Sequence, residues 1–192
     1  MADNTQALIR ERIKEEFKKC AQNPDYFLTR YCYIQHPIRG KILFSTFQYQ
    51  KDTLRAFVEH DYNIVLKGRQ IGISTLVAGY SLWLLLFHSD KNILVIATKQ
   101  DTAKNLVTKV RVMHANLPIW LKGKCITDNK LSLQFANGSQ IKAVASSKDA
   151  GRSEALSLLI LDEAAFIDDA EVIWTAASST LSTGGKAILL ST

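Results

Sequence analysis

The 192-residue sequence is short of cysteine and has no long apolar run. Its three cysteines, Cys20, Cys32 and Cys125, are odd in number and far apart, so neither a disulfide framework nor a cysteine zinc site is indicated. This cysteine usage fits a reducing cytosol best. The longest apolar run, residues 82–87, is too short to span a membrane, and the charged N-terminus is unlike a signal peptide. We therefore expect no membrane partner.

The composition is that of an ordinary soluble globular protein, long enough for one domain with a substantial core. Hydrophobic residues make up 47% and charged residues 22%. The net charge of +6 and the pI of about 9.2 are compatible with a polyanionic partner such as nucleic acid. Many proteins without such a partner are equally basic, so the charge alone does not identify one.

Strand and helix patterns alternate along most of the chain. Apolar periodicity predicts helices over residues 5–20, 47–60, 74–87, 101–115 and 169–180. Apolar runs predict strands over residues 62–68, 92–98, 156–163 and 187–192, and a hairpin around Asn137-Gly138 within residues 130–146. Continuous apolar strands separated by helices predict an α/β fold with a mostly parallel central sheet flanked by helices. Because the last strand stops at Thr192, we expect the sequence to be a truncated piece of a longer protein.

The segment KGRQIGIST, residues 67–75, departs at one position from the phosphate-loop pattern G-x-x-x-x-G-K-[ST]. Gly68 and Gly72 keep the glycine spacing and Ser74 stands in the Ser/Thr place, but Ile73 occupies the lysine position. A strand, a glycine turn and a helix N-terminus form an anion cradle, because backbone N–H groups point inward and the helix dipole favours negative charge. Ser74 would then place its hydroxyl on Mg²⁺. The alternative is an ordinary turn in which Ser74 caps the helix.

Two basic residues lie close enough to replace the missing lysine. Lys67, at the end of the strand, has a stem long enough to bend over the loop, and we predict that it contacts the β- or γ-phosphate. The alternative is a solvated strand end. We expect Arg69, inside the loop, to point outward as a sensor or finger, and Ile73 to pack beneath the first helical turn.

The apolar segment LLILDE delivers two carboxylates at the tip of a buried strand. Hydrolysis of a nucleoside triphosphate needs one carboxylate to hold Mg²⁺ and another to activate the attacking water. Asp162 suits the first role and Glu163 the second. Alternatively, the two acids are solvated or cap a following turn. The glycine loop and the acidic pair, in this order and both at carboxyl ends of strands, together predict nucleotide hydrolysis.

Three further segments have both a functional and a structural interpretation. Gln50, at a helix start, is able to read an adenine edge and Tyr49 to stack on the base, or both simply begin a surface helix. Arg152 is placed to reach a nucleotide held by a neighbouring subunit, or to form a surface salt bridge. The predicted helix 101–115 presents either a nucleic-acid or motor contact or a solvated basic face, through Lys104, Lys109 and Arg111.

The ordered set PDYFLTRYCYIQHPIRG, FQYQKDTL, GRQIGIST, ILVIATKQ, GRSEALSLLILDEAAFI and ILLST resembles the N-terminal ATPase half of the large terminase subunit of tailed bacteriophages. The resemblance covers nearly the whole chain. It implies a P-loop NTPase of the additional-strand type, with an N-terminal helical or lid segment over residues 1–45 and an ATPase core over residues 46–192. Ile73 departs from the usual loop, and some terminases carry their lysine at the start, which Lys67 would match.

Carried to this chain, the resemblance assigns a role to each motif. It implies an adenine motif at Tyr49 and Gln50, Walker B at Asp162 and Glu163, and a coupling motif beginning at Ser191 and Thr192. Arg69 matches an arginine proposed to act in cis, and Arg152 one proposed to act in trans. Walker A would comprise Lys67, Gly68, Arg69, Gln70, Ile71, Gly72, Ile73, Ser74 and Thr75.

The resemblance also implies ATP and Mg²⁺ as cofactors and a function in packaging viral DNA into procapsids. The implied partners are double-stranded DNA, the portal protein, the small terminase subunit and further copies forming a ring on the portal. The implied location is the host cell cytoplasm, with transient docking at the portal vertex and absence from the mature virion. The family's nuclease half has no counterpart here, so no DNA cleavage is expected. The alternatives are a helicase-like ATPase stimulated by nucleic acid and a nucleotide-binding assembly module with a disabled loop.

Overall fold

A seven-stranded sheet forms the centre of the molecule in a computed structural model that describes residues 2–147, 155–182 and 184–192. Five strands are mutually parallel and two antiparallel strands extend the sheet at one side. The predicted mostly parallel α/β fold is therefore confirmed. In order across the sheet the strands are β3 (Tyr62–Leu66), β9 (Lys186–Ser191), β8 (Leu158–Asp162), β4 (Asn92–Ala97), β7 (Gln140–Ala145), β6 (Ser132–Phe135) and β5 (Cys125–Asp128).

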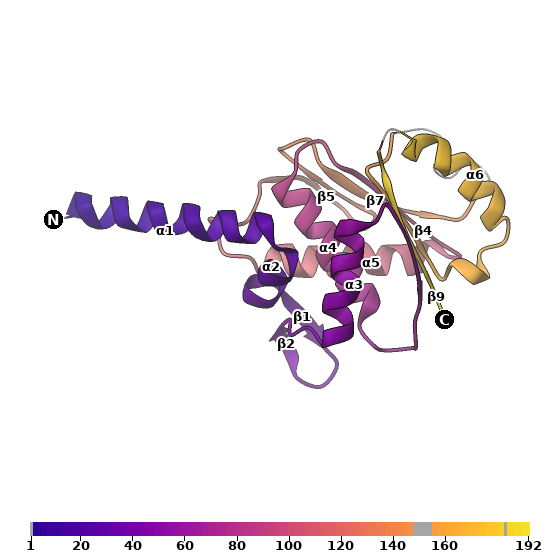
Figure 1. Ribbon diagram of the computed structural model, residues 1–192, viewed down its shortest axis with the longest axis horizontal. Coiled ribbons are helices and arrows are strands. Elements are labelled where there is room, and N and C mark those ends of the chain that lie inside the picture. Colours follow the sequence, from indigo (N-terminus) through magenta and orange to yellow (C-terminus); the bar gives the residue numbers. More distant parts are fainter. Residues whose placement is uncertain (1, 148–154, 183) are drawn as a thin grey trace.

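Helices cover both faces of this sheet (Figure 1). One face carries α3 (Gln48–Glu59), α4 (Ile73–Phe87) and α5 (Gln100–Ala115), and α6 (Ala170–Leu181) covers the other. Helix α4 is apolar and buried on almost every side, because it lies between the sheet and the outer helices. Apolar layers therefore cover both faces of the sheet, and the polar side chains of the candidate site lie at the ends of its strands.

The N-terminal residues form a helix, a second short helix and a hairpin. Helix α1 (Ala2–Gln22) projects away from the body of the molecule (Figure 1). It is followed by α2 (Pro24–Tyr31) and the antiparallel strands β1 (Tyr33–His36) and β2 (Gly40–Leu43). No described helix, α1 included, has both the length and the apolar character needed to cross a bilayer.

The predicted helices and strands are present within a few residues of their predicted ends, and the pattern missed several short elements. Asn-Pro and Arg-Gly pairs in the sequence suggest turns at residues 23–24 and 39–40. Asn23-Pro24 is instead the start of α2, because the Asn23 side chain accepts a hydrogen bond from Tyr26 N–H and Pro24 lies in the first helical turn. Arg39-Gly40 is the hairpin turn, with Gly40 at φ +68°. Strands β1, β2 and β5 and the 3₁₀ helix η1 (Ala164–Phe166) were not predicted.

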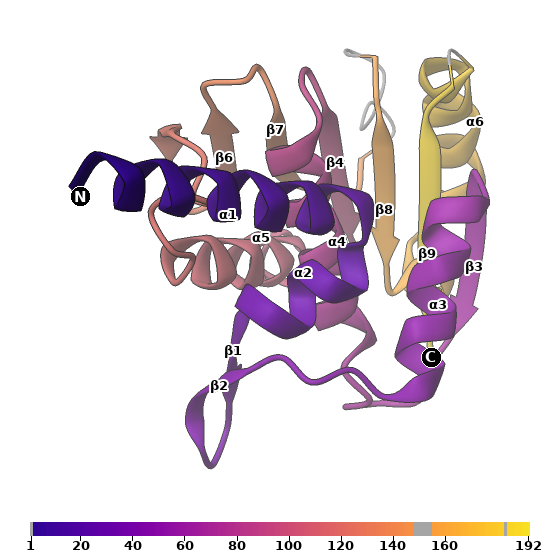
Figure 2. The ribbon, with the colours of Figure 1, turned by 60° about the vertical axis from the view of Figure 1, so that its left-hand side comes forward.

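Parallel pairing aligns the carboxyl ends of the strands at one edge of the sheet (Figure 2). Leu66 at the end of β3 pairs with Ser191, and Asp162 at the end of β8 pairs with Ala97. Strand β9 lies between β3 and β8. The segments that follow β3 and β8 therefore leave the sheet two strands apart.

Strand β3 is the border strand of the described sheet and is apolar on an exposed face. Tyr62, Ile64 and Leu66 have exposed fractions of 57%, 83% and 83%. Their β9 partners on the same face include Ala187 and Leu189, which pack against the α6 layer. Helix α6 thus covers β9 but not β3, apart from an edge-to-face contact between the rings of Tyr62 and Trp174.

The shifted pKa values of two histidines make the stability of the fold depend on pH. Burial lowers the pKa of His88 and His114, although a backbone hydrogen bond with Gly123 partly opposes the shift at His114. A lowered folded pKa means that the unfolded chain binds more protons between that value and the unfolded pKa of about 6.5. We expect the melting temperature to be level above this pH and to fall as the pH is lowered to about 5.5. His114→Gln should flatten part of the fall, and a melting temperature that rises on acidification would contradict this account.

Candidate functional site

The loop between β3 and α4 owes its shape to one glycine. Helix α4 begins at Ile73 with Gly72 as its N-cap at φ +79°. A side chain on Gly72 would also place its Cβ 2.7 Å from Nε2 of Gln50 and displace the Gln50 amide, so both the backbone conformation and the space favour glycine there. At Gly68, by contrast, an added Cβ would make an ordinary contact of 3.7 Å with Ile71. Because Ser74 lies inside the first helical turn, the interpretation that it caps the helix is wrong.

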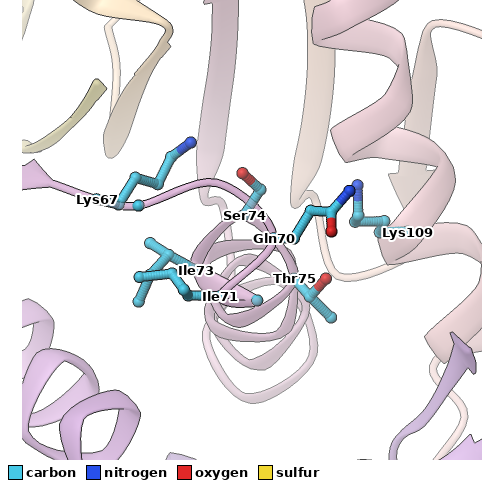
Figure 3. A pocket seen from close by; sticks show the side chains of 9 residues that line it. Lys67, Gln70, Ile71, Ile73, Ser74, Thr75 and Lys109 are labelled. Carbon is cyan, nitrogen blue, oxygen red and sulfur yellow. The ribbon is translucent and has the colours of Figure 1, made fainter. Parts of the chain in front are cut away.

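The side chain at the lysine position of the loop is buried. Ile73 has an exposed fraction of 3% and belongs to the core cluster beneath α4, as predicted. It therefore contributes packing and no charge. Above the loop is a pocket of about 260 Å³ (Figure 3), which we call the loop pocket. It is lined by Lys67, Gly68, Gln70, Ile71, Gly72, Ile73, Ser74, Thr75 and Lys109.

Lys67 supplies a positive charge to the loop pocket from the end of β3. Its side chain extends over the loop toward the space above Ser74 (Figure 3). Its backbone N–H donates to Ser191 O at 2.8 Å. Within the described residues its ammonium has no ion-pair or hydrogen-bond partner. Lys67 thus lies where the prediction requires it, and its contact with phosphate stays a prediction.

The two acids lie at the end of β8. Asp162 is buried, with an exposed fraction of 7%, and its Oδ1 accepts a hydrogen bond from Glu163 N–H at 3.1 Å. Burial raises the pKa of the Asp162 carboxyl, and the positive charge of Lys67 is the largest effect opposing that rise. Lys67 and Asp162 are therefore electrostatically coupled across the strand ends, even though β9 separates their strands.

Glu163 opens a second, wider pocket of about 520 Å³ next to the loop pocket; we call it the acid pocket. Glu163 at φ +58° and Gln70 at φ +62° hold left-handed backbone conformations that are strained for residues with side chains. Such strain is common where a site fixes a side chain. The acid pocket is lined by Lys67, Arg69, Gln70, Glu163, Phe166 and Thr192.

Ser191 connects the loop to the segment after the acids. Its backbone O accepts from Lys67 N–H at 2.8 Å, and its Oγ accepts from Ala165 N–H at 3.3 Å. Thr192 lies beside Glu163 in the acid pocket. The residues assigned by resemblance to coupling therefore contact both halves of the site, although their role in sensing hydrolysis remains a prediction.

Gln50 and Tyr49 hold the loop by its backbone. Gln50 is buried, with an exposed fraction of 2%; its Oε1 accepts from Phe47 N–H at 3.0 Å and its Nε2 donates to Ile71 O at 3.1 Å. The Tyr49 hydroxyl donates to the same Ile71 O at 2.7 Å. Both atoms of the Gln50 amide are thus engaged by backbone, so in this structure Gln50 positions the loop. Its reading of an adenine edge stays a prediction.

Phe47 is an aromatic residue that the sequence analysis missed. Its ring stacks on Tyr49 with centroids 5.7 Å apart and an interplanar angle of 7°, and 65% of the residue is exposed. An exposed flat ring beside the loop is suited to stack on a base. The F-x-Y spacing at the start of the helix, with Phe47 as its N-cap, was the available signal.

We expect Tyr49→Phe to weaken nucleotide binding about fivefold, because it removes one hydrogen bond to Ile71 O and keeps the stacked ring. A fluorescence titration with ATP and ADP measures the change. Thr53→Val is the matched control, since the Thr53 hydroxyl bonds to Tyr49 O within the helix and not to the loop. Equal affinity of Tyr49→Phe and the parent chain would show that Gln50 alone suffices to hold the loop.

The basic residues of α5 separate into two kinds. Lys104 lies 3.7 Å from Asp101, and Arg111 pairs with Asp128 at 2.6 Å. Lys109 instead lines the loop pocket, so it is not simply part of a solvated basic face. Arg152, predicted to act in trans, lies outside the described residues.

The oxygen donors at the strand ends suit magnesium. The Ser74 hydroxyl and the Asp162 carboxylate are hard ligands of the kind that Mg²⁺ prefers, and Mg²⁺ usually keeps several waters and one or two carboxylates beside phosphate oxygens. No cluster of three or more His, Cys, Asp or Glu side chains suited to a metal occurs in the described part of the chain. The assignment of Ser74 and Asp162 to a magnesium ion shared with phosphate stays a prediction.

Comparisons with known proteins identify the family and the fold of the chain. Residues 64–192 match the family model described as terminase large subunit, T4likevirus-type, N-terminal. The large terminase of bacteriophage HK97 is similar, with a TM-score of 0.72 at 21% identity over 90% of this chain and 37% of that chain. The ATPase domain of the Thermus phage P74-26 large terminase has a TM-score of 0.58 at 23% identity, over 78% and 65% of the two chains.

A third relative is the large terminase of a thermophilic bacteriophage, in complex with ADP. It has a TM-score of 0.58 at 16% identity, over 75% of this chain and 38% of that chain. At these identities the structural likeness establishes the fold. This chain spans little more than a third of the HK97 protein.

Proposed function

This chain belongs to the terminase large-subunit family, and we propose that it is the ATPase domain of a viral DNA-packaging motor. It would hydrolyse ATP to drive translocation of double-stranded DNA into a procapsid. The observation that carries the proposal is the meeting of Lys67, Gln70 and Glu163 in adjoining pockets at the strand ends. In this proposal the loop is the phosphate cradle and Glu163 is the neighbouring base that hydrolysis requires.

The chain's own residues account for the chemistry. The loop backbone and Lys67 bind the phosphates, while Tyr49 and Gln50 keep the loop in place. Glu163 accepts a proton from a water molecule while the oxygen of that water attacks the γ-phosphorus. The bond from that phosphorus to the bridging oxygen breaks, and ADP and inorganic phosphate leave. Magnesium, when bound by Ser74 and Asp162, supplies charge neutralisation at the phosphate oxygens.

Family membership supports our proposals for the nucleotide and the partners. Structures of the thermophilic bacteriophage's large terminase are in complex with ADP and with ATP-γ-S, which supports ATP as the nucleotide here. We propose the portal protein, the small terminase subunit and further copies of this chain in a ring as its assembly partners. In such a ring Arg152 would act on the nucleotide of a neighbour. The proposed location is the host cytoplasm, docked transiently at the portal vertex and absent from the mature virion.

A phosphate-release assay with ATP and Mg²⁺, with and without double-stranded DNA, tests the proposal. We expect ATP-dependent release that increases with DNA or on assembly. ATP binding with no release under any of these conditions would favour the disabled assembly module. Separation of the strands of a labelled duplex would favour the helicase-like alternative.

A further inference from the structure

Lys109 reaches the loop pocket from a different element than the loop itself. It comes from the third turn of α5, the helix that follows β4, and lines the pocket opposite Lys67 (Figure 3). In the close view Ser74 lies between the two lysines, and the Gln70 side chain extends toward Lys109. Positive charge therefore faces the pocket from two sides.

The packing of α5 favours this orientation of Lys109. Its side chain also lines a neighbouring apolar pocket of about 290 Å³, together with Val112 and Met113. These residues are three and four positions further along the helix and share its face. The aliphatic stem of a lysine packs on such a surface while its ammonium extends to the polar end. Thr75, in the first turn of α4, lines both pockets. The ammonium of Lys109 therefore extends from the apolar pocket toward the first turn of α4.

The ammonium of Lys109 has no direct partner in the part of the chain that the structure describes, although its charge, like that of Lys67, lowers the pKa of the Asp162 carboxyl against the effect of burial. No ion pair or hydrogen bond of its ammonium occurs there, in contrast to Lys104 and Arg111. The described lining of the loop pocket contains two lysines and no acid. Two like charges facing one pocket repel each other, and an anion between them removes this repulsion and gains attraction from both.

We propose that Lys109 is a phosphate-binding residue that contacts the γ-phosphate of ATP from the side opposite Lys67. The inference rests on the proposed function, because it requires ATP in the loop pocket. The two lysines together take the place of the single lysine that Ile73 replaces. Because Lys109 belongs to α5, this contact would also make the position of α5 depend on whether the terminal phosphate is bound.

The test compares Lys109→Met with the parent chain in titrations with ATP and ADP. Methionine keeps an unbranched stem against Val112 and Met113 and removes only the charge. We expect about fivefold weaker ATP binding and less than about twofold change for ADP, since the contact is to the terminal phosphate. Lys104→Met is the matched control on the same helix and should leave both affinities within about twofold.

Each other outcome has a defined meaning. A parent chain that does not bind ATP overturns both the proposed function and this inference. A parent chain that binds ATP, with an equal affinity in Lys109→Met, overturns the inference alone. Weaker binding of double-stranded DNA with unchanged ATP affinity would assign Lys109 to DNA instead and also overturn it.

A second measurement does not depend on the folding of a variant. Amine labelling of the parent chain, read by mass spectrometry with and without a non-hydrolysable ATP analogue, reports the access to each lysine. We expect the analogue to protect Lys109 and Lys67 and to leave Lys104 reactive. Equal labelling of Lys109 in both conditions overturns the proposal.

Discussion

Glu163→Gln should bind ATP within a few-fold of the parent chain and hydrolyse it about 10² times more slowly or worse. The substitution keeps size and hydrogen bonding and removes the only part of the side chain that accepts a proton. Binding should survive because Glu163 lines the acid pocket and not the loop pocket. Single-turnover phosphate release measures the chemical step, and a nucleotide titration measures affinity beside it.

The matched control for this prediction is Glu171→Gln. Glu171 is an exposed acid in the first turn of α6 and lines neither pocket. Its substitution changes the net charge by the same amount and should retain full activity. Near-normal hydrolysis by Glu163→Gln would remove Glu163 from the role of base and leave its strained backbone without a catalytic explanation.

Lys67→Ala should weaken ATP binding or turnover by at least about tenfold, equivalent to roughly 1.4 kcal/mol. The reason is the charge that Lys67 brings over the loop, which Ile73 cannot supply because its side chain is packed in the core. Lys67→Arg should recover part of the loss, as it keeps the charge. Ile73→Lys is a poor rescue variant, since it would move a cation into a buried apolar position.

Lys99→Ala provides the control for Lys67→Ala. Lys99 is an exposed residue at the N-cap of α5, near the carboxyl end of β4, and lines neither pocket. We expect it to keep the affinity of the parent chain in the same titration. Wild-type binding and hydrolysis by Lys67→Ala would refute the idea that the lysine has moved to the start of the loop.

The regular part of the fold could be predicted because its signals are local. Continuous apolar strands and glycine spacing identified the parallel sheet and the loop without tertiary information. The start of α2 was missed because Asn-Pro has two meanings. It marks a turn in many sequences, and here it is a capping residue followed by proline in the first helical turn.

The site was predictable only where position along a strand fixes position in space. Asp162 and Lys67 end parallel strands, so the sequence places both at one edge of the sheet. The role of Gln50 in holding the loop and the approach of Lys109 depend on how helices pack against that edge. Periodicity shows which face of α5 is apolar, but it does not show which turn of α5 will lie next to the loop between β3 and α4.

The placement of β9 between β3 and β8 has a consequence for stiffness. Strand β3 pairs only with β9 in the described sheet, and Ser191, the last residue of β9, accepts from Lys67 N–H with its backbone O and from Ala165 N–H with its Oγ. A small displacement of β9 along its axis would change both of these distances at once. The loop and the segment after the acids are therefore mechanically linked through β9. A movement of either one that keeps its hydrogen bond to Ser191 would also shift the other.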